Sequence, residues 1–136
     1  MAKVEQERDY EIDAQQMWKT IGDFARLDDW AAGIESIDII DEGRTRRLNL
    51  SGGAVIVEHL VDEGEQTYTY SLDPGGALPV TNYTSTLSTE DAGDGRCTVR
   101  WTAEFDAADG TPEETAVQII NMVYASGLET IAKKLG

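Results

Sequence analysis

One acidic residue and three tyrosines are the side chains of this sequence that are best suited to chemistry. Glu58 lies in the segment VEHL, while Tyr68, Tyr70 and Tyr83 lie in segments where polar and apolar residues alternate. A carboxyl group in an apolar pocket can act as a general acid or base, and phenol hydroxyl groups can polarise a carbonyl oxygen. These residue types suit an aldol cyclisation or a dehydration.

A binding role explains the same residues without catalysis. In this interpretation Glu58 pairs with Arg8 of the first strand, which supplies positive charge, or with a tyrosine, and the group orients a ligand. We favour binding, because a single carboxylate lacks the partner that a definite acid–base mechanism requires. His59 follows Glu58 directly, so in a strand the two side chains point to opposite faces and cannot act as a pair.

Other kinds of reaction centre have little support. The one cysteine, Cys97, is interpreted as a packed small hydrophobic residue. One histidine and one cysteine in separate strands do not form a metal-ligand set, and no glycine-rich phosphate loop precedes a helix, so we predict no metal and no cofactor. Arg44, Arg46 and Arg47 form a basic cluster, which we interpret as a solvated strand that balances neighbouring acids.

The charge balance disfavours several classes of partner. The formal net charge is -15, with 26 acidic residues against 11 lysines and arginines. Such a surface repels nucleic acids and anionic membranes. The N-terminal residues lack the apolar core of a secretion signal and no run approaches 18 apolar residues, so we expect no membrane insertion and a cytoplasmic location. The length fits one domain, residues 1–136.

The order of the expected elements predicts an α+β fold. Residues 3–12 alternate as a strand, and Asp13 is a candidate N-cap for a helix through AQQMWKTIGDF. A second short helix is expected at Ala25–Trp30, and a long one from Pro112 to Leu135. Six strands joined by short, glycine-bearing turns lie between them, at Ser36–Asp41, Thr45–Ser51, Ala54–Val61, Gln66–Leu72, Val80–Ser88 and Cys97–Asp106. We therefore expect a curved, seven-stranded antiparallel sheet with the C-terminal helix across its concave face.

The alternation within these strands predicts an inward face that carries polar groups. The inward rows are Ile56, Glu58 and Leu60; Tyr68, Tyr70 and Leu72; Tyr83, Ser85 and Leu87; and Val99, Trp101 and Phe105. Buried phenol and carboxyl groups need hydrogen-bond partners, which a cavity with water or a ligand supplies. In the alternative phase the polar groups face outward, but Ile56, Leu60 and Leu87 are then exposed together.

Several segments, taken in order, resemble the polyketide cyclase/dehydrase-like members of the START/Bet v 1 superfamily, which have the helix-grip fold. They are Trp18-x-x-x-Gly22-Asp23-Phe24-x-x-Leu27-x-x-Trp30, VEHL with Glu58, YSL at 70–72, LPVTNYTSTL at 78–87, and Trp101 ahead of DGTPE at 109–113. The resemblance covers essentially the whole chain. It implies that a small, mostly apolar ligand lies between the sheet and the helix.

Two loops are similar in position to the gate and latch of the plant abscisic-acid receptors, which share this fold. They are LSGGA at 50–54 and GGALP at 75–79, followed by Asn82 and Tyr83. The resemblance implies that Leu78, Pro79 and Val80 cover the mouth of the pocket; a static plug at the open end of the sheet is the alternative. The lysine with which the receptors bind a carboxylate is replaced by Ala31, so carboxylate recognition is not implied.

The alternation and the resemblance together predict one ligand site. Its residues are Trp30, Ile56, Glu58, Leu60, Tyr68, Tyr70, Leu78, Pro79, Tyr83, Ser85, Trp101, Ile120, Val123, Tyr124 and Gly127. The leading hypothesis is binding of a small, mostly apolar polyketide, isoprenoid, sterol-like or aromatic molecule. The alternatives are a cyclase or dehydratase with Glu58 as general acid or base and the tyrosines as oxyanion donors, and a ligand-gated protein-interaction module. A protein partner or a homodimer is compatible with the sequence.

Overall fold

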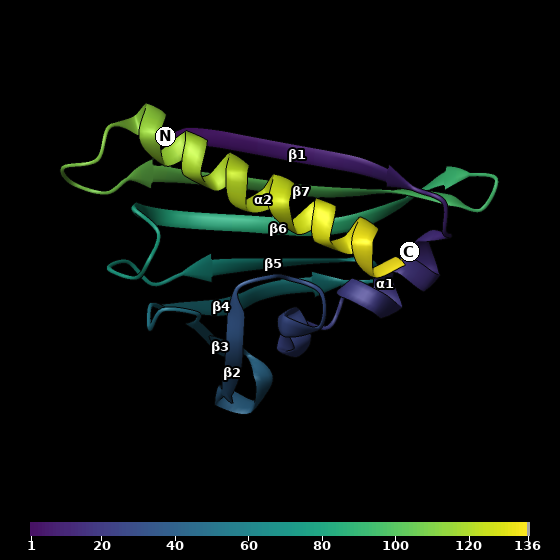
Figure 1. The fold of residues 1–136 in the computed structure, drawn as a ribbon, viewed down its shortest axis with the longest axis horizontal. Helices are drawn as coiled ribbons and strands as arrows, with labels where there is room; N and C mark the ends of the chain where they lie inside the picture. The colour runs from purple at the N-terminus through teal and green to yellow at the C-terminus, as the bar shows by residue number, and fades with distance from the viewer. Residues whose placement is uncertain (136) are drawn as a thin grey trace.

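A seven-stranded antiparallel sheet curves around a long C-terminal helix (Figure 1). The computed structural model describes residues 1–135. The elements in chain order are β1 (Ala2–Tyr10), α1 (Ala14–Ile21), the 3-10 segment η1 (Phe24–Asp29), β2 (Ile34–Ile40), the 3-10 turn η2 (Asp41–Gly43), β3 (Thr45–Leu50), β4 (Val55–Gly64), β5 (Thr67–Leu72), β6 (Val80–Gly93), β7 (Arg96–Ala107) and α2 (Glu113–Leu135). This confirms the predicted helix-grip architecture.

The sheet is a meander that the first strand completes. Its spatial order is β1-β7-β6-β5-β4-β3-β2, so β2 to β7 follow one another and β1 returns to pair with β7. The β1–β7 ladder runs from Ala2 opposite Phe105 to Tyr10 opposite Cys97. The short turns predicted between successive strands account for the antiparallel order.

Alternate residues of the central strands are buried, as the sequence pattern predicts. In β5 and β7 every second side chain points into the core. Leu87 and Phe105 are fully buried and Ile56 is 9% exposed, so the alternative phase is excluded. The inward rows therefore face α2 and the short helices.

Two hairpins differ from the prediction. The sequence predicts turns at 62–65 and 91–95, but β4 continues to Gly64 and β6 to Gly93. The actual turn of the second hairpin is Asp94–Gly95, and both residues have positive φ, 53° and 73°. This is the geometry of a two-residue turn that matches the twist of the flanking strands. Because the turn is so short, residues 91–93, which were predicted to belong to it, remain in strand β6.

A bulge in β6 changes which residues face inward at its start. Thr81 lies opposite Asp106 and Thr84 opposite Glu104, so Asn82 and Tyr83 together face a single residue of β7. Asn82 has a φ of 51° at this point. The extra residue breaks the alternation, and both Val80 and Tyr83 are buried.

The helix α1 begins at the predicted N-cap. The Oδ1 atom of Asp13 accepts a hydrogen bond from the backbone N–H of Gln16 at 2.8 Å. Met17 and Ile21 are fully buried, and the ring of Trp18 lies so close to Gly22 that a Cβ atom there would be 2.3 Å away. The second predicted helix is present as the 3-10 segment η1, one residue earlier than expected.

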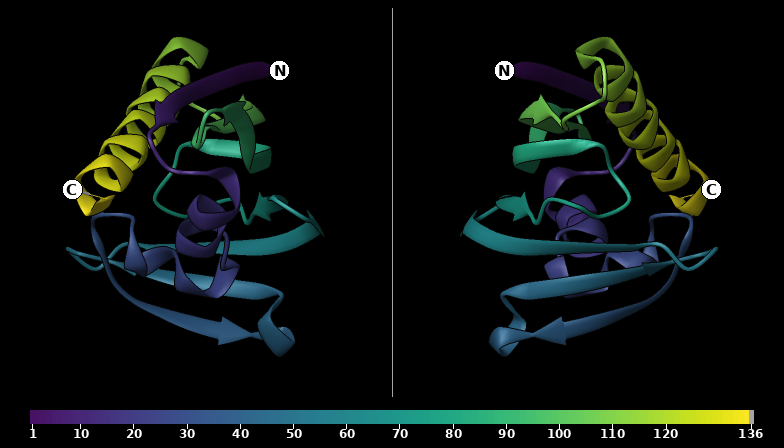
Figure 2. Two further views of the ribbon diagram at one scale, coloured as in Figure 1. Left: turned by 90° about the vertical axis from the view of Figure 1, so that its right-hand side faces the viewer. Right: turned by 90° about the vertical axis from the view of Figure 1, so that its left-hand side faces the viewer.

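The long helix α2 is fastened along β1. The hydroxyl of Tyr10 donates to the backbone carbonyl of Leu128 at 2.6 Å, and Gln6 donates to Asn121 at 3.0 Å. Figure 2 shows α2 on the β1 side of the sheet, with β2 to β4 at the other end. The remaining part of the concave face is therefore left to η1 and the segment that follows it.

Candidate functional site

A cavity of about 280 Å³ lies between the sheet, the middle of α2 and the segment that joins η1 to β2. Most of its lining is apolar, and the polar side chains are few. The lining residues are Leu27, Ala31, Ala32, Gly33, Ile34, Leu48, Leu50, Ile56, Glu58, Tyr70, Ala77, Leu78, Tyr83, Trp101, Val123, Tyr124, Ser126 and Gly127.

The structure brings a large part of the predicted site together around this cavity. The predicted residues that line it are Ile56, Glu58, Tyr70, Leu78, Tyr83, Trp101, Val123, Tyr124 and Gly127. They come from β4, β5, β6, β7, α2 and the loop before β6. Alternation along the strands and the spacing on the helix were the signals for these residues, apart from Leu78, which the resemblance to the latch loop indicated.

Six predicted residues lie outside the lining: Trp30, Leu60, Tyr68, Pro79, Ser85 and Ile120. Trp30 packs edge-on against Trp101, with ring centroids 5.5 Å apart. Ile120 is fully buried against the sheet, and Tyr68 lies deeper, among Trp18 and Phe24. Trp30 and Tyr68 thus pack against Trp101 and Tyr70, which line the cavity.

The two loops that resemble a gate and a latch meet at the cavity. Leu50 from the first loop and Leu78 from the second both line it. The backbone N–H of Ala77 donates to the carbonyl of Val55 at 3.3 Å, which ties the second loop to β4. Val80 is 1% exposed and packs inward because of the β6 bulge, so it does not cover the mouth as the resemblance implied.

Sequence reasoning missed one side of the cavity. Ala31, Ala32, Gly33 and Ile34 form an irregular segment that carries no periodic signal. Leu48 and Leu50 were detectable, because they alternate with Arg46 along β3 and share its inward face.

Arg46 and Glu58 form a buried ion pair beside the cavity. They lie directly opposite each other on β3 and β4. The Nε atom of Arg46 donates to Oε1 of Glu58 at 2.7 Å; Nη2 is equally close to the same oxygen but is not oriented for a hydrogen bond. The side chain of Arg46 is fully buried and that of Glu58 is 7% exposed. The prediction that Glu58 pairs with Arg8 or a tyrosine is wrong, because its partner is Arg46. The prediction that the arginine cluster is solvated is wrong for Arg46.

Arg8 instead lies on the outside of the fold. It pairs with Glu129 of α2 at 2.6 Å, and both side chains are about half exposed. Arg47 pairs with Asp38, also in an exposed position. Only Arg46 of the cluster turns inward, because strand alternation places it on the same face as Leu48.

Aromatic rings enclose the guanidinium of Arg46. Its central carbon lies 4.1 Å from the ring centroid of Phe24 and 5.0 Å from that of Tyr70. Nη1 donates to the backbone carbonyl of Phe24 at 2.8 Å. Burial disfavours the charged form, but Glu58 and the neighbouring phenol groups outweigh this effect, so the pKa of Arg46 is raised above its ordinary value. Arg46 thus links η1, β3 and β4 around one permanent charge.

A chain of hydrogen bonds joins the hydroxyl groups behind the cavity. Ser85 donates its single hydroxyl proton to the backbone carbonyl of Thr102 at 2.9 Å. Tyr124, whose hydroxyl oxygen is 2.7 Å from Ser85 Oγ, must therefore donate to Ser85. Tyr83 in turn must donate to Tyr124, with which it makes a short contact. The protons of all three hydroxyl groups are therefore used within this chain.

Trp101 forms part of the cavity wall and donates a hydrogen bond to Tyr70. Its Nε1 donates to the hydroxyl oxygen of Tyr70 at 3.1 Å, and its ring stacks on Tyr124 at 4.2 Å with 5° between the planes. A Cβ atom at Gly127 would lie 2.6 Å from the Trp101 ring. The mid-helix glycine is therefore explained by the close approach of this tryptophan.

All five tyrosines of the chain are buried, and we expect an alkaline limit to stability as a result. Burial raises the pKa of Tyr83 to about 12, and it raises the pKa of Tyr10, Tyr68, Tyr70 and Tyr124 as well. Because the folded state holds these protons more tightly, their contribution to the free energy of unfolding is complete below the ordinary pKa of 10.0 and is lost as the pH rises further.

Tyrosinate absorbance and circular dichroism, recorded together during a titration, measure this effect. We expect no tyrosinate absorbance near pH 10, where the native circular dichroism spectrum persists. At higher pH the tyrosinate absorbance should rise cooperatively, together with the loss of the native circular dichroism spectrum. A tyrosine that titrates with its ordinary pKa in folded protein contradicts the expectation.

The other candidate reactive groups lie away from the cavity. His59 is on the opposite face from Glu58, as predicted, and contacts Thr45 and Asp73. Cys97 is buried, and burial raises the pKa of its thiol, as expected for a packed residue. Among residues 1–135, no three histidine, cysteine or acidic side chains gather as a metal site would require, and no helix is long and apolar enough to cross a membrane.

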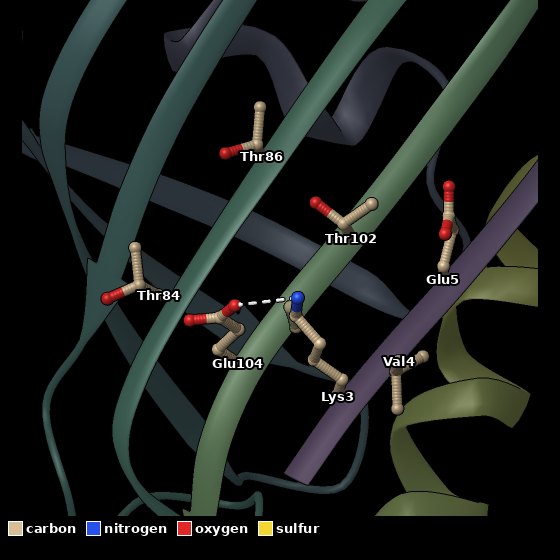
Figure 3. Close-up of a pocket in the computed structure, with 8 residues that line it drawn as sticks. Lys3, Val4, Glu5, Thr84, Thr86, Thr102 and Glu104 are labelled. Atoms are coloured by element: carbon tan, nitrogen blue, oxygen red, sulfur yellow. Dashed lines mark ion pairs between the residues drawn. The ribbon is translucent and has the colours of Figure 1, made fainter. Parts of the chain in front are cut away.

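A second, larger hollow of about 420 Å³ lies on the outer face of β1, β6 and β7 (Figure 3). Its side chains include Thr84, Thr86 and Thr102, with an ion pair of 3.3 Å between Lys3 and Glu104. Lys3 and Glu104 are 80% and 52% exposed, so this surface is solvated. It lacks the apolar walls of the inner cavity, and we regard the inner cavity as the candidate site.

The sheet, the gripped helix and the cavity between them form the helix-grip fold, which a START superfamily protein of Mycobacterium smegmatis shares at 16% identity, with a TM-score of 0.70 over 98% of this chain and 93% of its own. Residues 1–136 match the family described as polyketide cyclase/dehydrase and lipid transport, and the chain belongs to that family. The resemblance found in the sequence is thereby confirmed.

Solved structures with this fold include two from bacilli. The protein XoxI of Bacillus cereus is 28% identical, with a TM-score of 0.92 over 98% of this chain and 95% of that one. A Bacillus thuringiensis protein is also 28% identical, with a TM-score of 0.90 over 96% of each chain. The Zhui aromatase/cyclase of a Streptomyces species, at 13% identity, has a TM-score of 0.79 over 98% of this chain and 92% of its own, which shows the shared fold. No curated protein matches the sequence.

Proposed function

We propose that this protein binds one small, largely apolar molecule in the cavity between the sheet and α2. The observation that carries the proposal is a chamber of about 280 Å³ with mainly apolar walls and a few fixed polar groups. Ligand pockets have this character, and their volumes are roughly 300–1,000 Å³. Burial of apolar ligand surface supplies binding free energy of about 25 cal/mol per Å².

The volume favours a compact ligand of one or two rings, or an isoprenoid of similar size. A sterol or a multi-ring polyketide requires the mouth to open, and the contacts of Leu50 and Leu78 there make these loops the elements that would move. The proposal also includes a single domain over residues 1–136 and a cytoplasmic location.

Catalysis is the second candidate. The shared fold with an aromatase/cyclase and a carboxylate at the cavity favour it. Against it, the protons of Tyr83 and Tyr124 are engaged in the chain to Ser85, so these phenols are not free to polarise a carbonyl. A ligand-gated interaction with a protein partner is a third proposal, for which the loop of Leu78 at the mouth is the relevant element.

A tryptophan at the mouth of the cavity tests the proposal. Ser126 is exposed and lines the cavity, so Ser126→Trp should fill the mouth without disturbing the core. We expect the affinity for an apolar aromatic probe such as naphthol to fall at least about tenfold, which isothermal titration measures.

The matched control is Ala125→Trp, one residue away on the same helix, exposed and outside the lining. It should bind the probe as the natural protein does. Equal affinities of both variants for the probe would show that binding occurs elsewhere.

A further inference from the structure

The second carboxylate oxygen of Glu58 is an unused hydrogen-bond acceptor at the cavity. Nε of Arg46 donates to Oε1 at 2.7 Å, and Nη2 lies equally close to that oxygen without donating to it. Oε2 accepts no hydrogen bond from any of residues 1–135, yet it is not sealed in the core, and Glu58 lines the cavity. The side chain of Glu58 is only 7% exposed. Its free carboxylate oxygen therefore needs a hydrogen-bond donor, because removing it from water without one is unfavourable.

The charge of this carboxylate is already balanced. Arg46 is fully buried behind Glu58 and does not reach the cavity lining. A bound cation would add a second positive charge to a neutral pair, and a bound carboxylate would face Glu58 with like charge. Both arrangements leave a net charge away from water, which is unfavourable. The pair therefore suits an uncharged group.

The other polar groups at the cavity offer few protons. Tyr83 and Tyr124 donate along the chain that ends at the Thr102 carbonyl. Tyr70 accepts from Nε1 of Trp101. A ligand that only accepts hydrogen bonds consequently leaves Oε2 of Glu58 without a donor.

We propose that the ligand is an uncharged hydroxyl compound, an alcohol or a phenol on an apolar frame, whose O–H group donates to Oε2 of Glu58. This inference rests on the proposed function and adds the chemical class of the ligand. Glu58 is then the residue that determines specificity, and Arg46 is a positioning residue that turns Oε2 toward the cavity.

Four naphthalene derivatives of similar size test the proposal by isothermal titration with the natural protein. Naphthol donates a proton, methoxynaphthalene only accepts, naphthoate is an anion, and aminomethylnaphthalene is a cation at neutral pH. We expect naphthol to bind at least about tenfold more tightly than each of the others, the size expected for one hydrogen bond to a charged acceptor. Equal or tighter binding of any of the other three overturns the assignment.

The double variant Arg46→Met with Glu58→Met supplies the second measurement, because it removes the acceptor without leaving a buried charge. We expect naphthol and methoxynaphthalene to bind this variant equally. A preference for naphthol that survives in the double variant overturns the role of Glu58. If none of the four probes binds the natural protein, the proposed function itself fails; if all four bind alike, the function stands and only this inference fails.

Discussion

Replacement of Arg46 by methionine should lower the free energy of unfolding by about 3–5 kcal/mol. The substitution keeps much of the side-chain volume but leaves the carboxylate of Glu58 buried without its partner. It also removes the hydrogen bond to the carbonyl of Phe24, which holds η1 against the sheet. A domain of this size is stable by roughly 5–15 kcal/mol, so the loss should be plain in urea denaturation.

Two further variants separate charge from packing at this position. Arg47→Met is the matched control, because the neighbouring Arg47 forms an exposed pair with Asp38, and we expect a loss of less than about 1 kcal/mol. The double variant of Arg46 and Glu58 to methionine should recover most of the stability. If the double variant is as unstable as Arg46→Met alone, the isolated charge of Glu58 is not the cause.

Replacement of Trp101 by alanine should have an effect of similar size, about 3–5 kcal/mol in the free energy of unfolding. Trp101 stacks on Tyr124, packs edge-on against Trp30 and donates to Tyr70, so its removal opens a hole and leaves three neighbours unsupported. The hole joins the existing cavity, and we expect the variant to accept aromatic probes too large for the natural protein.

Trp18→Ala is the comparison for this variant. Trp18 is half-buried on α1, contacts Tyr68 and does not line the cavity. We expect a smaller loss of stability and an unchanged range of probes. A Trp101→Ala protein whose stability and probe range match those of Trp18→Ala would show that Trp101 is not a wall of the site.

The regular strands were the most predictable part of this fold. Strict alternation in β5 and β7 was enough to turn Tyr70 and Trp101 inward, because a period of two residues admits only two phases and one of them exposes several large apolar side chains. The spacing of Val123, Tyr124 and Gly127 likewise placed one face of α2 toward the cavity.

Arg46 shows where reasoning from residue types failed. Arginines are usually exposed, and three of them close together suggested a solvated strand. The buried position follows from a pairing, since Arg46 meets Glu58 across the β3–β4 ladder. The sequence alone does not identify Glu58 as this partner, because the pairing depends on the β3–β4 register that the turn at 51–54 sets. The cavity wall at Ala31–Ile34 was unpredictable for another reason, because irregular backbone has no period.

The pairing of β1 with β7 has a consequence for biosynthesis. Residues 2–10 leave the ribosome well before their ladder partners, residues 97–105. Val4 and Tyr10 therefore stay uncovered during synthesis until β7 has been translated. Such distant pairing slows folding and exposes an unpaired strand edge, so this chain should benefit from chaperones that shield its first ten residues during synthesis.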